Sequence, residues 1–342
     1  MKKLSELFKG YPLDFDLEIK GIKTSSKEIE EGDLFLCIKG LGVDRHDYID
    51  DAIKRGATAL VVSKDIDADI PYIKVDDTNA IIDELYRRFY DNPQDDLKII
   101  GITGTDGKTS SATIIQTLIG ADICGYIGTN GYSCAKFKKD TNNTTPDKDK
   151  LYGYFREFVD AGCKYVAMEA SSEAFFYHRL DNITFEIGGI SNITSEHLNT
   201  HKTLENYIDC KKELFRKIKD GGYSILNKDD KHYDDLLDVA KNPLTYGRCK
   251  ENDLYIKEEE FYPNKTLLNL VYQDKEYKIK SPLLGAFNSE NLSLSILTCL
   301  ALGFNMQDII KKIPDINISG RMDIVDEGQN FYCLVDYAHT PN

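Results

Sequence analysis

Residues 97–110 have the sequence LKIIGITGTDGKTS, and this stretch decides what kind of fold the chain has. The apolar run from Leu97 to Ile102 is typical of a buried strand, and a glycine-rich loop follows it. A helical pattern then runs from about Lys108 to Ile119. A strand, a glycine loop and a helix in this order are typical of a phosphate site, because backbone N–H groups and the helix N-terminus can face phosphate oxygens.

The loop contains the side chains that nucleotide chemistry needs. Its residues are Gly104, Thr105, Asp106, Gly107, Lys108, Thr109 and Ser110. A lysine at this place reaches the terminal phosphates, and a threonine hydroxyl can bind magnesium. The common spacing G-x-x-x-x-G-K-[ST] needs glycine at position 102, where this chain has Ile102, so the loop is a variant. A glycine-rich turn without a ligand is the alternative, but the lysine and the helix together favour nucleotide binding.

The segments on either side alternate between strand-like and helical patterns, which predicts an α/β fold with a mostly parallel sheet. Short alternating segments near residues 251–281 predict a hairpin insertion, and the polar stretch 91–96 is typical of a linker. We therefore expect a small α/β domain at 1–92, a central P-loop ATPase domain at 93–317 and the start of a C-terminal α/β domain at 318–342. A strand begins at Phe331, close to the last residue, so we expect that third domain to be truncated.

Composition narrows the class of protein further. The chain has 342 residues and a formal net charge of -14, which argues against nucleic-acid binding because that requires a basic face. No apolar stretch is long enough for a membrane span, and the N-terminus lacks the apolar run of a signal peptide. The eight cysteines form no C-x-x-C pair, and Cys37, Cys163 and Cys299 sit in apolar runs. Buried free thiols in a cytoplasmic monomer, without nucleic-acid or membrane partners, are the expectation.

The pattern G-T-x-G-K-[ST] after an apolar strand resembles the ATP loop of the Mur ligases and the folylpolyglutamate synthetases. Further segments follow in the order found in the Mur subgroup that adds the third residue of the cell-wall stem peptide. The resemblance runs from about residue 20 to the end, through the segments 144–146 (TTP), 168–172 (MEASS), 177–179 (YHR), 192–199 (NITSEHLN), 210–215 (CKKELF), 285–288 (GAFN), 320–322 (GRM) and 335–341 (VDYAHTP).

The resemblance implies a catalytic centre that uses ATP and two Mg²⁺ ions. It implies that Lys108 is catalytic, that Thr109 and Glu169 are metal ligands, and that His197 is associated with the second metal ion. It also implies that Lys211 is carbamylated, so that an anionic oxygen replaces a cation and completes the catalytic set. Taken alone, these residues have ordinary alternatives: a solvated acid at a strand end, a satisfied polar histidine, and one half of an exposed double lysine.

Ligand contacts are implied in the same way. The implied additional ATP contacts are Asn288, Asn291, Arg321 and Asp336. The implied uridine contacts are Ser26, Leu41, Gly42 and Val43, and the implied muramoyl-peptide contacts are Thr144, Thr145, Ser171, Tyr177 and Arg179. The chain departs from the family pattern mainly on this substrate side, where it has Ser25 and Lys27 around Ser26, Arg45 in place of glycine, Glu173 in place of histidine and Tyr177 in place of glutamine.

The implied reaction joins a free amino acid to a UDP-N-acetylmuramoyl-dipeptide in peptidoglycan precursor synthesis. ATP would first convert the substrate carboxylate into an acyl phosphate, which the amine then attacks. Two alternatives remain: a ligase like the folylpolyglutamate synthetases, and a binding protein without catalysis. Because the amino-acid site is expected in the third domain, we expect this chain to bind nucleotides without completing the amide bond.

Overall fold

The computed structural model describes residues 1–40, 42–194, 196, 198–325 and 327–337. The chain divides into two compact units. The first unit comprises residues 1–96 with 147–157, and the second comprises residues 97–146 with 158–342. Within the described ranges, no helix has both the length and the apolar character that crossing a bilayer would require.

The first unit is built on a parallel sheet with the strand order β3-β4-β5-β6, beside a separate antiparallel pair β1-β2. Its strands β4 and β5 are almost entirely buried on both faces, as expected for a sheet covered by other elements. The elements are β1 (Lys2–Lys3), α1 (Leu4–Leu7), β2 (Glu18–Ile19), β3 (Ile22–Lys23), η1 (Ser26–Glu28), β4 (Asp33–Leu36), η2 (Arg45–Tyr48), α2 (Ile49–Lys54), β5 (Ala57–Val62), β6 (Tyr72–Lys74), α3 (Thr78–Phe89) and η3 (Pro93–Asp95).

Residues 147–157, which include most of helix α5 (Lys148–Ala161), pack within this first unit. The ring of Tyr152 stacks on the ring of Tyr86 in α3, with 6.3 Å between the centroids. Lys148 forms an ion pair with Asp83, whose side chain is only 8% exposed. Long-range contacts of this kind attach a segment that is distant in sequence.

Replacing Lys148 by methionine should destabilise the first unit by about 2 kcal/mol, because it removes the ion pair between the lysine and the buried carboxylate of Asp83. Urea unfolding would measure the change. The matched control is Lys150→Met, because Lys150 is 39% exposed beside Glu28. We expect less than about 1 kcal/mol there, as is usual for an exposed ion pair. Equal losses in the two variants would contradict the assignment of Lys148 to a structural pair.

The second unit contains one large mixed sheet. Its described strands follow the order β10-β9-β8-β11-β7-β12-β13-β14-β15-β16-β17. The pairs from β8 to β15 are parallel, and antiparallel strands extend both edges. The strands are β7 (Lys98–Thr103), β8 (Cys124–Gly128), β9 (Gly131–Cys134), β10 (Phe137–Lys139), β11 (Tyr165–Glu169), β12 (Phe185–Ile190), β13 (Ile218–Asn227), β14 (Pro243–Gly247), β15 (Leu254–Tyr262), β16 (Lys265–Tyr272) and β17 (Lys275–Ser281).

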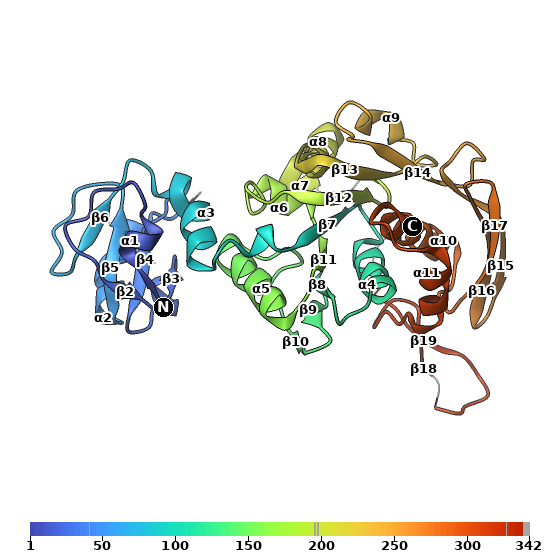
Figure 1. The fold of residues 1–342 in the computed structure, drawn as a ribbon, viewed down its shortest axis with the longest axis horizontal. Helices are drawn as coiled ribbons and strands as arrows, with labels where there is room; N and C mark the ends of the chain where they lie inside the picture. The colour runs from blue at the N-terminus through green and yellow to red at the C-terminus, as the bar shows by residue number, and fades with distance from the viewer. Residues whose placement is uncertain (41, 195, 197, 326, 338–342) are drawn as a thin grey trace. The chain divides into compact units, whose positions relative to one another are not determined.

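Helices cover both faces of the parallel part of this sheet. Figure 1 shows α4, α10 and α11 together inside the curve of the sheet, with α8 on the opposite face. The helices are α4 (Lys108–Ile119), α6 (Ser172–Phe176), α7 (Leu198–His201), α8 (Leu204–Arg216), α9 (Tyr233–Leu236), α10 (Ala286–Ala301), α11 (Met306–Lys312) and the short η4 (Ile313–Asp315). The mostly parallel sheet predicted from the sequence is therefore confirmed.

The core of the second unit lies between the sheet and the helices α4 and α10. Ile100 and Ile102 of β7 pack there with Ile114 and Leu118 of α4, and all four are almost fully buried. The predicted hairpin insertion corresponds to the antiparallel strands β15, β16 and β17. Beyond η4, the strands β18 (Asp323–Val325) and β19 (Cys333–Val335) form a small antiparallel pair. All eight cysteines fall within the described ranges, and each is a free thiol.

Candidate nucleotide and metal site

A cavity of about 710 Å³ lies in the second unit at the carboxyl ends of its parallel strands. This is where open α/β sheets usually bind their ligands. The whole loop from Gly104 to Ser110 lines the cavity, and so do Glu169, Asn291, Arg321 and Asp336. Residues that the sequence places far apart therefore surround one space.

The loop connects β7 directly to α4. Gly107 immediately precedes the helix and has a φ of +81°, a conformation that favours glycine. A Cβ atom at this position would lie 2.3 Å from Oδ1 of Asn291, so the loop also needs glycine for close packing against α10. The N-terminus of α4 consequently faces the cavity without a side-chain cap, which is the arrangement that binds phosphate.

Lys108 lies folded over the loop. Its Nζ donates to the carbonyl oxygens of Gly104 at 3.0 Å and Thr105 at 2.7 Å. Burial lowers the pKa of Lys108, and the nearby carboxylates of Glu169 and Glu196 oppose that effect. A phosphate in the cavity would give this amine stronger, charge-assisted partners than two carbonyls.

Glu169 ends β11 beside the loop and is fully buried. Its Oε2 accepts a hydrogen bond from the hydroxyl of Thr109 at 3.0 Å. A carboxylate and a hydroxyl at this separation are the hard oxygen donors that Mg²⁺ uses, and Mg²⁺ commonly takes only one or two protein ligands beside phosphates and water. The pair Thr109 and Glu169 therefore fits the metal ion that the family resemblance implies.

The segment that follows β12 holds the loop in place. Asn192 accepts from the backbone N–H of Asp106 at 3.0 Å, and its carbonyl accepts from the N–H of Thr105 at 2.9 Å. Thr194 and Thr105 exchange two further hydrogen bonds. Glu196 of the same segment lies on the cavity wall. The predicted metal-associated residue His197 lies outside the described residues.

Lys211 is buried in α8, with only 1% of the residue exposed. Its Nζ lies 4.2 Å from the ring centroid of Tyr207, and the hydroxyl of Tyr207 bonds with that of Thr105 at 3.1 Å. Burial lowers the pKa of Lys211 well below its ordinary value, and the charge of Lys108 adds to this effect. The neighbouring Lys212 instead forms an ion pair with Asp238. The two adjacent lysines thus have different environments: Lys211 is buried, whereas Lys212 pairs with Asp238. Their spacing in the sequence could not predict which of the two would be buried.

Helix α10 forms another side of the cavity. Asn291 lines it and accepts from the hydroxyl of Ser111 at 3.3 Å. Asn288 is buried behind it, donates to the carbonyl of Leu284 and accepts from Asn291. The predicted ATP contact Asn288 thus lies behind the cavity wall, where its hydrogen bond orients Asn291.

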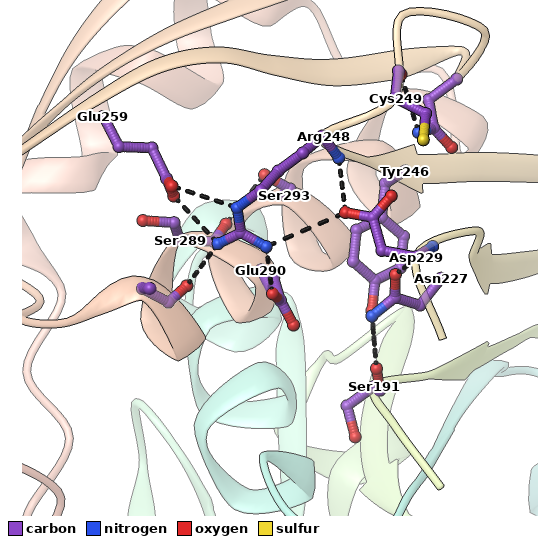
Figure 2. Close-up of polar contacts among 12 residues, drawn as sticks. Ser191, Asn227, Asp229, Tyr246, Arg248, Cys249, Glu259, Ser289, Glu290 and Ser293 are labelled. Carbon is purple, nitrogen blue, oxygen red and sulfur yellow. Dashed lines mark hydrogen bonds and ion pairs between the residues drawn. The ribbon is translucent and has the colours of Figure 1, made fainter. Parts of the chain in front are cut away.

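Arg248 holds the beginning of α10 against the sheet, as Figure 2 shows. It follows β14, and its guanidinium contacts Glu290 and the carbonyl of Ala286 in α10. It also forms a hydrogen bond with Glu259 of β15 at 3.1 Å, and its backbone N–H donates to Asp229. One arginine thereby joins the start of α10 to β15 and to the segments that follow β13 and β14.

Four of the five predicted peptide contacts lie on the side of the cavity near β11 and α6, and the fifth, Tyr177, is not among the lining residues. Thr144, Thr145, Ser171 and Arg179 all line it. Thr145 is fully buried, and its hydroxyl donates to the carbonyl of Glu169 at 2.8 Å. Arg179 donates to the carbonyl of Thr145, and its guanidinium carbon lies 5.6 Å from the ring centroid of Tyr177, which is 44% exposed.

The predicted uridine contacts belong to the first unit. Ser26 is buried at the start of η1, whereas Gly42 and Val43 are exposed and Leu41 lies outside the described residues. The adjacent His46 is held on both ring nitrogens. Its Nδ1 lies 2.6 Å from Oδ1 of Asp44, and its Nε2 accepts from the N–H of Ser63 at 3.0 Å. Hydrogen bonds from His46 hold the pKa of Asp44 at about 2.

Tyr126 and Thr129 are among the residues of the site that the sequence did not predict. Tyr126, in β8, and Thr129, just after it, both form hydrogen bonds with Glu169. Their signal was weak, because a tyrosine in an apolar strand is usually a core residue. Tyr126 and Thr129 reach the carboxylate because β8 is the neighbour of β11 in the sheet.

Comparison with known proteins gives matches along most of the chain. The profile of the Mur ligase middle domain matches residues 102–299, and that of the Mur ligase family, catalytic domain, matches residues 18–90. The UDP-N-acetylmuramoyl-L-alanyl-D-glutamate–2,6-diaminopimelate ligase of Fusobacterium nucleatum subsp. nucleatum is 36% identical over 337 residues, which cover 96% of this chain and 68% of that protein. The ligase of the same name from Clostridium perfringens is 35% identical over 359 residues, covering 99% and 73%.

A solved structure agrees with these sequence matches. The structure of a UDP-N-acetylmuramoyl-L-alanyl-D-glutamate–2,6-diaminopimelate ligase superposes with a TM-score of 0.81 at 26% identity. The superposition covers 99% of this chain and 72% of that one. The likeness therefore includes the three-dimensional arrangement as well as the sequence.

Proposed function

The chain belongs to the Mur ligase family, and we propose that it is an ATP-dependent ligase that acts on UDP-N-acetylmuramoyl-L-alanyl-D-glutamate. The observation that supports this most strongly is the composition of the cavity in the second unit. The phosphate loop and Glu169 line one part of it, and Thr144 and Arg179 line another. A nucleotide phosphate and a substrate carboxylate could therefore meet in the same space.

The chemistry that suits this cavity is activation of a carboxylate by ATP. A substrate carboxylate oxygen attacks the γ-phosphorus, ADP leaves, and an acyl phosphate forms. An amine then attacks the acyl carbon, gives up a proton, and expels phosphate. Mg²⁺ would neutralise phosphate charge, with Thr109 and Glu169 as its protein ligands. Lys108 would bind the terminal phosphates, and Arg179 suits the substrate carboxylate because it offers paired donors.

Carbamylation of Lys211 is part of the proposal. The amine of Lys211 is buried and its pKa is well below the ordinary value, so the neutral, nucleophilic form of the amine is more populated than in an exposed lysine. That amine can add to carbon dioxide and release a proton, which leaves an anionic carbamate. The carbamate would supply oxygen donors for a second Mg²⁺ beside the loop.

The first unit is proposed to hold the uridine nucleotide. We assign this role to residues 1–92, with Ser26 and the exposed loop of Gly42 and Val43 as contacts. The hydrogen bonds of His46 with Asp44 and Ser63 fix the position of the residues that follow that loop. Residues 93–317 would form the ATP-binding domain, and residues 318–342 would begin the next one.

Binding of the substrate separates this proposal from the alternatives. By calorimetry with MgADP present, we expect saturable binding of UDP-N-acetylmuramoyl-L-alanyl-D-glutamate and no competition by a folate. Arg179→Ala should weaken that binding at least about tenfold, since a charge-assisted hydrogen bond contributes ~1.5–3 kcal/mol. The control Arg216→Ala removes an arginine that pairs with Asp209 on the surface of α8 and should leave affinity unchanged. Binding of the folate in preference to the UDP-sugar would contradict the proposal.

A further inference from the structure

The two oxygens of the Glu169 carboxylate have different kinds of partner. Oε1 accepts from the hydroxyl of Tyr126 and from the backbone N–H of Thr129, each at 2.8 Å. Oε2 accepts from the hydroxyls of Thr109, at 3.0 Å, and Thr129, at 3.3 Å. A backbone amide and a buried ring cannot rotate away, whereas the two hydroxyls can. Oε1 is therefore fixed by the protein, and Oε2 can exchange a hydroxyl for a metal ion.

Tyr126 is well suited to hold Oε1. It is only 3% exposed, and its oxygen accepts from the N–H of Asn130 at 3.4 Å. Since that contact uses a lone pair, the phenolic proton is left to point at Glu169.

Gly128 makes the contact between these groups sterically tight. A Cβ atom at position 128 would lie 2.1 Å from Oε1 of Glu169 and 2.3 Å from the hydroxyl of Tyr126. The strand therefore needs glycine at this point for the tyrosine and the carboxylate to meet. Any larger residue would force the carboxylate, the tyrosine ring or both to move.

We propose that Tyr126 is a positioning residue that limits Glu169 to one metal-binding oxygen and thereby favours Mg²⁺ over larger divalent cations. The inference rests on the proposed function, in which Glu169 binds the metal of the nucleotide. Mg²⁺ requires a near-octahedral set of ligands at short distance, whereas Ca²⁺ accepts both oxygens of one carboxylate at longer distance. When Oε1 is held away from the metal, Glu169 offers one oxygen, which is sufficient for Mg²⁺. Ca²⁺ then lacks the second carboxylate oxygen that it would otherwise bind.

The test compares ATP affinity by calorimetry in three solutions, with excess Mg²⁺, with excess Ca²⁺ and with EDTA. Tyr126→Phe should weaken binding of MgATP about tenfold, which is the usual size of an outer-shell effect on a metal site. Its affinities for CaATP and metal-free ATP should stay within about twofold of the parent, so the preference for Mg²⁺ falls about tenfold. The matched control is Tyr165→Phe, which removes a hydroxyl at the other end of β11 and should change none of the three affinities.

Two further variants decide how a negative result is interpreted. If Glu169→Gln weakens MgATP binding but Tyr126→Phe leaves the preference unchanged, the positioning role is wrong and the metal assignment stands. If Glu169→Gln also leaves MgATP binding unchanged, the metal assignment itself is wrong. Should Tyr126→Phe fail to fold, Gly128→Ala disturbs the same contact between the tyrosine and the carboxylate without removing the hydroxyl. It should lower the preference for Mg²⁺, and an unchanged preference would overturn the inference.

Discussion

The Lys108→Ala variant is expected to bind MgATP at least about a hundredfold more weakly than the parent chain. The amine of Lys108 lies over the loop, where it contacts two backbone carbonyls. With a nucleotide bound, it would donate to phosphate oxygens instead. Losing two charge-assisted hydrogen bonds at ~1.5–3 kcal/mol each corresponds to about a hundredfold or more in the dissociation constant. Calorimetry with a non-hydrolysable ATP analogue would measure it.

The control for this variant is Lys98→Ala. Lys98 begins strand β7, which leads into the loop, but its side chain is 50% exposed and pairs with Glu186. Removing that amine should leave MgATP affinity within about twofold of the parent, because exposed ion pairs contribute little. Equal affinity of Lys108→Ala and the parent would show that the loop does not bind the nucleotide.

Lys211→Ala is expected to remove the carbamate and with it the activation of the substrate carboxylate by ATP. In samples equilibrated with ¹³C-bicarbonate, the parent should show a carbamate carbon resonance that the variant lacks. ADP release that depends on UDP-N-acetylmuramoyl-L-alanyl-D-glutamate should fall at least about a hundredfold, since a metal ligand supports several kcal/mol of charge stabilisation. A short carboxylic acid such as acetate should restore part of this rate by supplying the missing oxygens.

The neighbouring lysine and the pH dependence provide the controls. Lys212→Ala should keep both the resonance and the rate, because Lys212 pairs with Asp238. Burial lowers the pKa of Lys211, so its amine stays neutral to lower pH than an exposed lysine. The resonance should therefore persist to lower pH than a carbamate on an exposed lysine would, and decline as acidification protonates the amine. A parent chain without a carbamate resonance at saturating carbon dioxide would contradict the proposal.

The local elements of the site could be predicted from the sequence because each depends on nearby residues. Strand β7, the glycine loop and α4 follow from an apolar run, two glycines and a helical pattern within residues 97–119. Glu169 could be placed at a strand end for the same reason. These features are set by backbone conformation and by hydrophobic periodicity over a few turns.

The partners of these elements could not be predicted, because they depend on the order of strands in the sheet. Tyr126 meets Glu169 only because β8 pairs with β11, and nothing near residue 126 specifies that neighbour. Burial of Lys211 depends on how α8 packs against the loop through Tyr207. The attachment of residues 147–157 to the first unit likewise arises from contacts with α3.

Trapping of the acyl phosphate tests the central claim most directly. The chain would be incubated with MgATP, UDP-N-acetylmuramoyl-L-alanyl-D-glutamate and hydroxylamine, which replaces the incoming amine and needs no amino-acid site. We predict that mass spectrometry will detect a hydroxamate of the UDP-sugar, that its formation will require ATP, and that the Lys108→Ala variant will not form it. ATP cleavage without any hydroxamate, or a hydroxamate that forms with a folate but not with the UDP-sugar, would contradict the account.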